Sequence, residues 1–319
     1  MPDSNPLVSI VIPTFGRPAL LRQCVEAARA QRCPFPYEIV VIDDGGTPAA
    51  AETLADIIDP RLTLKRMVNG GPAKARNEGI RLARGTFVAF TDDDCIPDPD
   101  WVRVAVEAFA DDVSMVQGSV APPQPASPLT YHFIETGNQP CDVTANLVGR
   151  RQALLAIGGF DEGFPYAAAE DYDLCWRLER VGKKRFAPNA RVVHALIPIT
   201  WQRRRSRARV MATYFRLYGL HPDRLKTIGL PGTRWARAAL LNLSPPLWIG
   251  TYVALVPFLD CLRNARRSAW SSVLAELAAT MLNLIEAVGL IGRYRREYNA
   301  AVRDGGRPGL LRDGAPQVA

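Results

Sequence analysis

Short apolar runs alternate with amphipathic segments along the first half of the chain. Segments that begin at Pro18 and at Gly71 carry apolar residues at helical spacing. Between such segments lie runs rich in β-branched or aromatic residues, each ended by polar or turn-forming positions, which is typical of buried strands. These runs are Val8–Ile12, Glu38–Ile42, Leu62–Leu64 and Phe87–Phe90. Strands that alternate with helices predict an α/β fold with a Rossmann-like, mostly parallel sheet flanked by helices.

Polar clusters follow three of the predicted strands at the point where each strand ends. Pro13–Thr14 follows the first strand, Asp43–Asp44 the second and Asp92–Asp94 the fourth. Open α/β sheets bind their ligands outside the carboxyl ends of the strands. We therefore expect the three clusters to line one edge of the sheet and to form a binding site there. A helix cap and first turn are also expected at Thr47–Pro48, after the second cluster.

The acidic clusters have two interpretations each. Asp92–Asp94 places three carboxylates together, and such groups repel one another unless a cation neutralises them. Oxygen ligands suit Mg²⁺ or Mn²⁺, which commonly bridge to substrate phosphates, but the same residues can form a solvated acidic turn. Asp43–Asp44 can accept hydrogen bonds from a nucleobase edge or a ribose hydroxyl. Alternatively, with Gly45–Gly46 behind it, this pair forms only a tight turn.

Three further features carry candidate chemistry. Glu170 and Asp171 begin a predicted helix, where paired carboxylates either supply a general base or simply complement the helix dipole. Gly71–Asn77 opens a helix with basic residues nearby, which favours a phosphate, although it lacks the spacing of a P-loop. His194 ends a predicted strand, and it is a candidate ligand only if it faces the acidic edge.

After about residue 200 the chain becomes strongly basic. Residues 201–319 contain 19 Lys and Arg against 7 Asp and Glu, whereas residues 1–200 contain 20 against 25. The acidic balance of the first part argues against a nucleic-acid groove there. The basic balance of the second part suits an anionic partner such as a phospholipid surface.

Two apolar segments, Ala238–Leu262 and Val273–Ile291, follow the run of arginines. Neither offers the roughly 20 uninterrupted apolar residues that a membrane-spanning helix needs. The second segment carries a polar stripe at helical spacing, formed by Glu276, Thr280, Asn283 and Glu286. This pattern predicts amphipathic helices that lie on a membrane or pack together. A hairpin through the bilayer and a helical dimerisation domain are the alternatives.

Cysteine spacing and the start of the chain add two expectations. The 6 cysteines form no C-x-x-C pair, which argues against a zinc or redox motif and favours reduced thiols. The first residues contain no basic segment ahead of a long apolar run. We therefore expect the N-terminal region to remain in the cytoplasm.

The motifs together resemble the family-2 glycosyltransferases of the GT-A fold. The resemblance covers roughly residues 7–195 and rests on SIVIPTFGR, EIVVIDDGG, GPAKARNEGI, FVAFTDDDCIPDPDW, GGFDEGF, AAAEDYDLCWRL and a strand ending in VVH. It implies a catalytic domain over residues 1–200, with a nucleotide-sugar half of about 1–118 and an acceptor half of about 119–200. Residues 201–319 are then a basic, apolar helical extension that is membrane-associated or dimerising.

The resemblance also implies an activity: inverting, metal-dependent transfer of a sugar from a nucleoside diphosphate to an acceptor hydroxyl. UDP is the expected nucleotide, with GDP and dTDP as alternatives, and the cofactor is Mn²⁺ or Mg²⁺. Asp171 matches the family's catalytic base, with Glu170 as the alternative. Asp94 and Asp92 match the metal-binding D-x-D pair, and His194 a position where some members supply a further ligand. Nucleotide-sugar binding is implied for Pro13, Thr14, Phe15, Arg17, Asp43, Asp44, Arg76, Asp92 and Asp93.

One departure from the family bears on the product. Processive polysaccharide synthases carry a Q-x-x-R-W signature, whereas Gln202–Arg205 is followed here by Ser206. We therefore expect transfer of single sugars. The character of residues 201–298 suggests an anionic membrane surface on the inner face of the cytoplasmic membrane, and hence a lipid-linked or cell-envelope acceptor. No nucleic-acid partner is expected, and a homodimer stays open.

A sugar nucleotidyltransferase and a non-catalytic sugar-nucleotide or glycan-binding protein are the competing functions. The first is expected to carry a Gly-rich, basic loop directly after the first strand, where this chain has Pro13–Arg17. The second is disfavoured because Asp92, Asp94 and Asp171 are all present. Release of nucleoside diphosphate from a sugar nucleotide distinguishes a glycosyltransferase from both.

Overall fold

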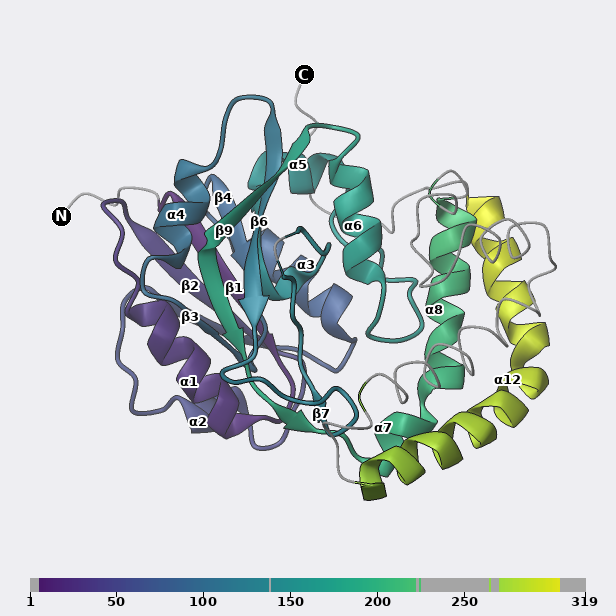
Figure 1. Cartoon of the computed structure of the whole chain (residues 1–319). Helices are drawn as coiled ribbons and strands as arrows, with labels where there is room; N and C mark the ends of the chain where they lie inside the picture. The colour runs from purple at the N-terminus through teal and green to yellow at the C-terminus, as the bar shows by residue number, and fades with distance from the viewer. Residues whose placement is uncertain (1–5, 138, 222–223, 225–263, 265–269, 305–319) are drawn as a thin grey trace.

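An eight-stranded sheet forms the centre of the protein, in the order β3-β2-β1-β4-β8-β6-β9-β5 (Figure 1). The computed structural model describes residues 6–137, 139–221, 224, 264 and 270–304. The parallel half consists of β3 (Leu62–Arg66), β2 (Tyr37–Asp43), β1 (Val8–Thr14) and β4 (Phe87–Phe90). The other half consists of β8 (Leu147–Arg150), β6 (Val113–Ala121), β9 (Lys183–His194) and β5 (Cys95–Pro97). The four strands expected in the first half and the mostly parallel α/β sheet are confirmed.

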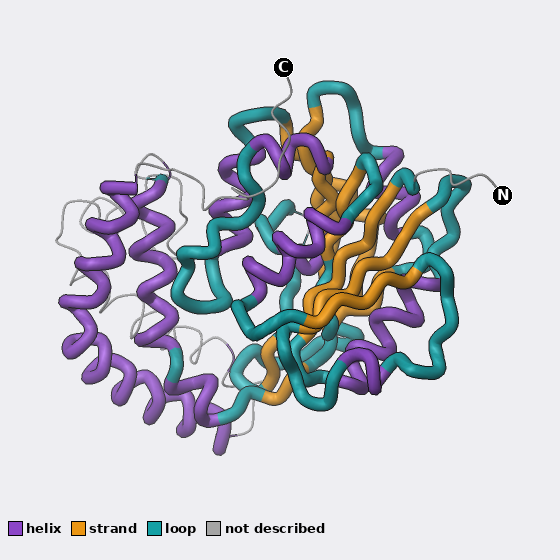
Figure 2. Tube along the Cα trace, turned by 180° about the vertical axis from the view of Figure 1, so that it is seen from behind, coloured by secondary structure: helices purple, strands orange, loops and turns teal. Residues whose placement is uncertain are grey.

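Helices cover both faces of this sheet, as Figure 2 shows from behind. Alternate residues of β1 point to opposite faces. Ile10 and Ile12 pack on the side of α1 (Pro18–Arg29) and α4 (Trp101–Glu107). Val11 packs on the other side, which is covered by α3 (Pro72–Leu82), α5 (Arg151–Ala156) and α6 (Glu170–Leu178). The described cysteines form no disulfide, as their spacing predicts; they are Cys24, Cys33, Cys95, Cys141 and Cys175.

The strand order brings the polar clusters to one edge. β1 lies between β2 and β4, and Thr14 at the end of β1 is paired with Asp43 at the end of β2. The expected convergence of the three clusters is therefore confirmed. The expected helix start at Thr47–Pro48 is wrong, because α2 (Ala50–Thr53) begins later. The Asp43 carboxylate accepts a hydrogen bond of 3.0 Å from the backbone NH of Ala50. Asp43 thus supplies a partner for a backbone NH group in the first turn of α2, which has no acceptor within the helix.

Helices after residue 200 form a separate layer beside the sheet (Figure 1). A 3-10 helix, η1 (Thr144–Asn146), precedes β8, and β7 (Tyr131–His132) pairs antiparallel with β10 (Ile197–Pro198). The chain then continues into α7 (Trp201–Arg205) and α8 (Arg207–Leu220). The last described helix is α12 (Trp270–Asp304), which lies side by side with α8. The rings of Phe215 and Tyr294 stack between α8 and α12, with centroids 5.1 Å apart.

The polar stripe of α12 faces the protein, and several of its large apolar side chains face outward. Glu276 and Asn283 are fully buried, and Glu276 forms an ion pair with Arg204 of α7. Arg209 of α8 lies 2.7 Å from Glu286. The side chains with large exposed apolar surface on this helix are Trp270, Leu274, Met281, Leu282 and Ile285. The expected amphipathic helix over 273–291 is confirmed, while Ala238–Leu262 lies outside the described residues.

No helix in the described part of the chain is by itself long and apolar enough to cross a bilayer. Trp270–Ala287 and Gly292–Ala301, which meet at 63°, satisfy the length and composition requirements only as a bent pair.

Candidate active site

A cavity of about 520 Å³ opens where β1, β2 and β4 end. The loops after these strands, the first turns of α3 and α6 and the end of β9 all contribute to its wall. Every candidate residue from the sequence except Asp43 lines this cavity: Pro13, Thr14, Phe15, Arg17, Asp44, Arg76, Asp92, Asp93, Asp94, Glu170, Asp171 and His194. Folding thus gathers side chains from both halves of the first 200 residues around one space.

Asp93 turns toward the loop after β1. The Thr14 hydroxyl donates a hydrogen bond of 2.6 Å to Asp93, and Arg17 lies 3.2 Å from its other oxygen. Burial raises the pKa of Asp93 to about 6, although Arg17 and the Thr14 hydroxyl favour the ionised form. Arg17 also forms an ion pair with Asp94. Asp93 and Asp94 therefore hold a half-exposed guanidinium against the cavity, where it can meet an anionic group.

Asp94 and His194 have the donor set and the spacing of a divalent-cation site. β5 pairs with β9, which places Cys95 opposite His194. Nδ1 of His194 donates a hydrogen bond of 2.7 Å to the carbonyl of Ala195, so in the neutral imidazole Nε2 is the nitrogen that can bind a cation. Nε2 lies 3.6 Å from Oδ1 of Asp94, and one ligand atom from each of Asp94, Cys95 and His194 lies within 4.8 Å of the other two. A carboxylate oxygen with an imidazole nitrogen can hold a divalent cation.

Arg76 is buried between two carboxylates. Its Nη2 lies 2.7 Å from Oδ1 of Asp92, and its Nη1 lies 3.1 Å from Oε1 of Glu170. The resemblance implies that Arg76 binds the nucleotide-sugar, and the structure places Arg76 in the wall of the cavity. Because Asp92 faces Arg76, the structure groups Asp94 rather than Asp92 with His194.

Glu170 and Asp171 lie at the first turn of α6. Burial raises the pKa of Glu170 against the opposing effect of Arg76, and Oε2 of Glu170 is buried without a hydrogen-bond partner in the described part of the chain. Burial, and after it the negative charge of Glu170, raise the pKa of Asp171 above the usual range of a carboxyl group. A carboxylate with a raised pKa in a cavity is suited to take up a proton as a general base.

The two neighbouring aspartates at the end of β2 have different surroundings. The Asp43 carboxylate accepts hydrogen bonds from the backbone NH groups of Gly45 and Gly46, at 3.1 and 3.0 Å. A Cβ atom on Gly46 would lie 2.1 Å from the nitrogen of Gly16, so this close approach of two loops requires glycine. Asp43 therefore builds the loop and lies outside the cavity wall.

Asp44 lines the cavity and also fixes the loop that leads into α3. Its two carboxylate oxygens accept hydrogen bonds from the backbone NH groups of Gly70 and Gly71, at 2.7 and 2.9 Å. The side-chain amide of Asn69 donates a third bond of 3.1 Å. Each carboxylate oxygen can accept more than one hydrogen bond, so Asp44 can still meet a nucleoside.

Among the residues in the cavity wall that the sequence analysis did not single out are His132, Tyr172, Arg203 and Tyr214. The ring of His132 stands nearly perpendicular to that of His194, with centroids 5.6 Å apart. Burial, and after it the charge of Arg203, lower the pKa of His132 to about 4, which keeps its imidazole neutral near pH 7. Tyr172 stands next to the recognised Glu170–Asp171 pair, but nothing in the sequence pattern points to the other three. Arg203 and Tyr214 come from the helical extension, so that extension contributes to the site.

The sequence has recognisable relatives among known proteins. Residues 9–160 match glycosyl transferase family 2, and residues 87–285, more than half of the 319 residues, match glycosyl transferase family group 2. The chain is 28% identical to a pre-mycofactocin glycosyltransferase of Mycobacterium tuberculosis over 361 aligned positions. That alignment spans 95% of this chain and 72% of the relative.

Two solved glycosyltransferase structures share the fold. The mannosyltransferase PcManGT from Pyrobaculum calidifontis, in complex with GDP-Man and Mn²⁺, is 20% identical with a TM-score of 0.53, over 95% of this chain and 88% of that one. GalNAc-T7 with UDP, GalNAc and Mn²⁺ is 16% identical with a TM-score of 0.53, over 74% of this chain and 54% of that one. The fold and the family matches lead to one conclusion: the chain belongs to the family-2 glycosyltransferases and is a glycosyltransferase of the GT-A fold.

Proposed function

We propose that the enzyme moves a sugar from a UDP-sugar to an acceptor hydroxyl with inversion at the anomeric carbon, in a reaction that depends on a divalent cation. The observation that carries the proposal is that Asp94, His194 and Asp171 line one cavity. A candidate cation-binding pair and a candidate base therefore face the same space, and inverting, metal-dependent glycosyl transfer uses both. GDP and dTDP remain alternatives to UDP, since PcManGT, which shares the fold, forms a complex with GDP-Man.

The nucleoside fits the part of the cavity at the ends of β1 and β2. Phe15 lines this part with a side chain that is 54% exposed, and an exposed aromatic ring offers a face on which a nucleobase can stack. Asp44 lies nearby with free acceptor capacity for a base edge or a ribose hydroxyl. Pro13 and Thr14 complete this wall, and Arg17 stands between it and Asp94, where the diphosphate would lie.

Asp94 and His194 are the residues that would hold the metal ion, as Mn²⁺ or Mg²⁺. When bound there, the ion neutralises the charge that develops on the leaving diphosphate. Arg17 adds positive charge from the protein on the same side of the cavity. Arg203, which also lines the cavity, adds a second guanidinium.

Asp171 is the proposed general base. The acceptor oxygen attacks the anomeric carbon while its proton moves to the Asp171 carboxylate. The bond between the anomeric carbon and the phosphate oxygen breaks, and the nucleoside diphosphate leaves with the electron pair. One displacement inverts the configuration and needs no protein nucleophile. The Arg76 guanidinium balances the charge of neighbouring Glu170, which allows two carboxylates to stand side by side at the start of α6.

For the acceptor, we propose a lipid-linked or cell-envelope glycan that receives a single sugar, with the enzyme bound peripherally to the inner face of the cytoplasmic membrane. The outward apolar side chains of α12 support this, since Trp270, Leu274, Met281 and Ile285 are each more than 60% exposed. A helix with such a face binds at the boundary between headgroups and acyl chains. The basic composition of residues 201–319 favours anionic lipid.

Flotation with liposomes tests the membrane part of the proposal. The wild-type protein is expected to float with anionic vesicles, and the variant Leu274→Glu/Ile285→Glu to remain in the dense fraction. Ile58→Glu is the matched control, because Ile58 is a 92% exposed apolar side chain on the catalytic domain. Absence of flotation of the wild-type protein, or equal flotation of all three proteins, contradicts membrane binding through α12.

A donor screen tests the activity itself. The protein is incubated with a panel of sugar nucleotides and Mn²⁺, and release of nucleoside diphosphate is measured with and without chelator. The proposal predicts release from at least one UDP-sugar that chelation and Asp94→Ala both abolish. Release of pyrophosphate instead indicates a nucleotidyltransferase, and binding without turnover indicates a sugar-nucleotide-binding protein.

A further inference from the structure

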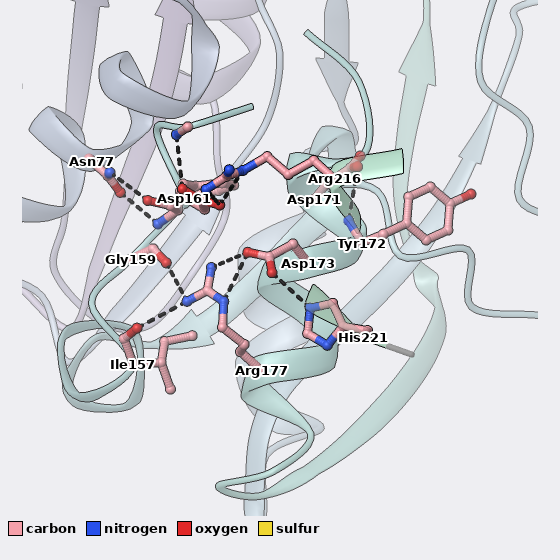
Figure 3. A network of polar contacts seen from close by, with 12 residues as sticks. Asn77, Ile157, Gly159, Asp161, Asp171, Tyr172, Asp173, Arg177, Arg216 and His221 are labelled. Atoms are coloured by element: carbon pink, nitrogen blue, oxygen red, sulfur yellow. Dashed lines mark hydrogen bonds and ion pairs between the residues drawn. The ribbon is translucent and has the colours of Figure 1, made fainter. Parts of the chain in front are cut away.

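Helix α8 of the extension lies against α6, the helix that begins with Glu170 and Asp171. Figure 3 shows the polar contacts between these elements. Arg216 and His221, at the C-terminal end of α8, reach two different points near the start of α6. Neither residue lines the cavity, and neither has a role in the mechanism described above.

Arg216 holds the turn that precedes α6. Its Nε lies 2.9 Å and its Nη2 2.7 Å from Oδ2 of buried Asp161. Asp161 in turn accepts a hydrogen bond of 2.9 Å from the backbone NH of Gly163. A Cβ atom on Gly163 would lie 2.4 Å from the guanidinium of Arg216, so the turn and the arginine fit closely. The turn is also fixed from α3, where Asn77 exchanges two hydrogen bonds with the backbone of Phe160.

His221 holds α6 itself. Its Nε2 lies 2.8 Å from Oδ1 of Asp173, which is two residues beyond Asp171. The other oxygen of Asp173 accepts a hydrogen bond of 2.9 Å from Arg177, and Arg177 also donates to the carbonyls of Ile157 and Gly159. Asp173, Arg177 and His221 are each at least nine-tenths buried. The network therefore joins α8, α6 and the turn after α5 into one unit (Figure 3).

The residue directly before the carboxylate pair has a strained backbone. Ala169 has φ +68° and ψ −4°, a left-handed conformation that costs a residue with a Cβ atom about 1–2 kcal/mol. Such a conformation persists only where the surrounding structure determines it. Leu217, which lies between Arg216 and His221 in the sequence, packs against Ala169 and Trp176. Helix α8 thus supports the backbone at the point where Glu170 and Asp171 enter the cavity.

We infer that Arg216 and His221 are positioning residues that hold Asp171 in the cavity from helix α8. The inference rests on the proposed function, because it takes Asp171 as the general base. It makes the helical extension part of the catalytic unit and not only an attachment to a membrane. A displacement of about 1 Å at a reacting group can cost about 10²-fold in rate. Loss of these contacts should therefore lower kcat without weakening donor binding, since the nucleoside wall is formed by other elements.

The test compares Arg216→Ala, Arg216→Lys and His221→Gln with a matched control. Arg209→Ala is that control, because Arg209 is an exposed arginine of the same helix that pairs with Glu286 of α12. We expect kcat to fall about 10–100-fold in Arg216→Ala and His221→Gln, with the donor KM within about twofold of wild type. Arg216→Lys keeps a cation near Asp161 and should recover part of the rate. Hydrogen–deuterium exchange should be faster over residues 161–175 in Arg216→Ala and His221→Gln and unchanged in Arg209→Ala.

The outcomes separate this inference from the proposed function. If the wild-type enzyme releases nucleoside diphosphate and both variants match Arg209→Ala in kcat, the inference is wrong while the proposed function stands. A loss of kcat that Arg216→Lys does not relieve at all, with exchange raised over the whole chain, indicates general unfolding and also contradicts it. If the wild-type enzyme turns over no donor, the proposed function fails. In that case unchanged exchange over residues 161–175 removes the structural half of the inference as well.

Discussion

Nη1 of Arg76 lies 3.1 Å from Oε1 of Glu170, although 94 positions separate the two residues in sequence. The same guanidinium pairs with Asp92 at 2.7 Å. One buried cation therefore joins α3 of the nucleotide half to the first turn of α6, next to the proposed base. Burial by itself lowers the pKa of Arg76. The negative charges of Asp92 and Glu170 outweigh this effect, and the pKa of Arg76 is raised above its usual value.

Replacing Arg76 should destabilise the fold. Arg76→Met leaves buried Glu170 without a counter-charge, and breaking a buried pair in this way costs about 3–5 kcal/mol of unfolding free energy. Arg81→Met is the control on the same helix, since Arg81 is 45% exposed and pairs with Glu78 on the surface. An exposed pair contributes about 0–1 kcal/mol. Urea unfolding measures both, and equal stability of the two variants contradicts the structural role of Arg76.

Removing the proposed base should slow turnover without weakening donor binding. Asp171→Asn keeps the shape of the side chain but cannot accept the acceptor proton, and general-base help is worth about 10²–10⁴-fold. We expect kcat to fall by that factor while the Kd for UDP, measured by calorimetry, stays the same. Asp111→Asn, an exposed position away from the cavity, should leave kcat unchanged. A variant at position 171 with wild-type kcat excludes Asp171 as the base.

The pH dependence of kcat should report the environment of Asp171. The base acts only when deprotonated, so kcat rises with pH through its pKa, which burial and then the charge of Glu170 raise above the usual carboxyl range. Glu170→Gln removes a negative neighbour, and this lowers the pKa of Asp171. The acidic limb of the kcat profile should therefore move to lower pH in Glu170→Gln. A limb that stays in place, or moves to higher pH, disagrees with this assignment.

Metal affinity should depend unequally on the two members of the D-x-D pair. Asp94 is grouped with His194, whereas Asp92 faces Arg76. Calorimetric titration of Mn²⁺ in the presence of UDP should show at least about a tenfold loss of affinity in Asp94→Asn and His194→Asn, the scale seen even for groups that only support metal ligands. Asp92→Asn should show a smaller loss. Equal losses at positions 92 and 94 would place both carboxylates on the ion.

The sequence pattern was sufficient to predict that the polar clusters lie at one edge of the sheet. The apolar residues of each strand and the polar residues that end it are neighbours in sequence, so both can be recognised without the fold. Alternate residues of β1 serve two faces, and acidic residues mark where β2 and β4 stop. It was not sufficient to choose between Asp43 and Asp44. Those neighbours differ only in their partners, which are Gly45–Gly46 for the first and the loop before α3 for the second. Such partners become visible only when the loops have packed.

The helical extension shows the same limit at a larger scale. The spacing of Glu276 and Asn283 predicted a polar stripe on α12, but not that the stripe would be buried. Its burial depends on arginines of α7 and α8, above all on Arg204, which pairs with Glu276. The contribution of Tyr214 to the cavity was invisible for a similar reason, since it depends on where α8 packs. The limits of the catalytic domain at residue 200 and of the extension remain predictions.

Anomalous diffraction from crystals soaked with Mn²⁺ and UDP tests the central proposal most directly. The account predicts a manganese peak bonded to Asp94 and His194, with the diphosphate of UDP on the same ion and the uracil at Phe15 and Asp44. Asp171 should then face the open side of the diphosphate. Manganese bound elsewhere, or UDP bound outside this cavity, would contradict the account.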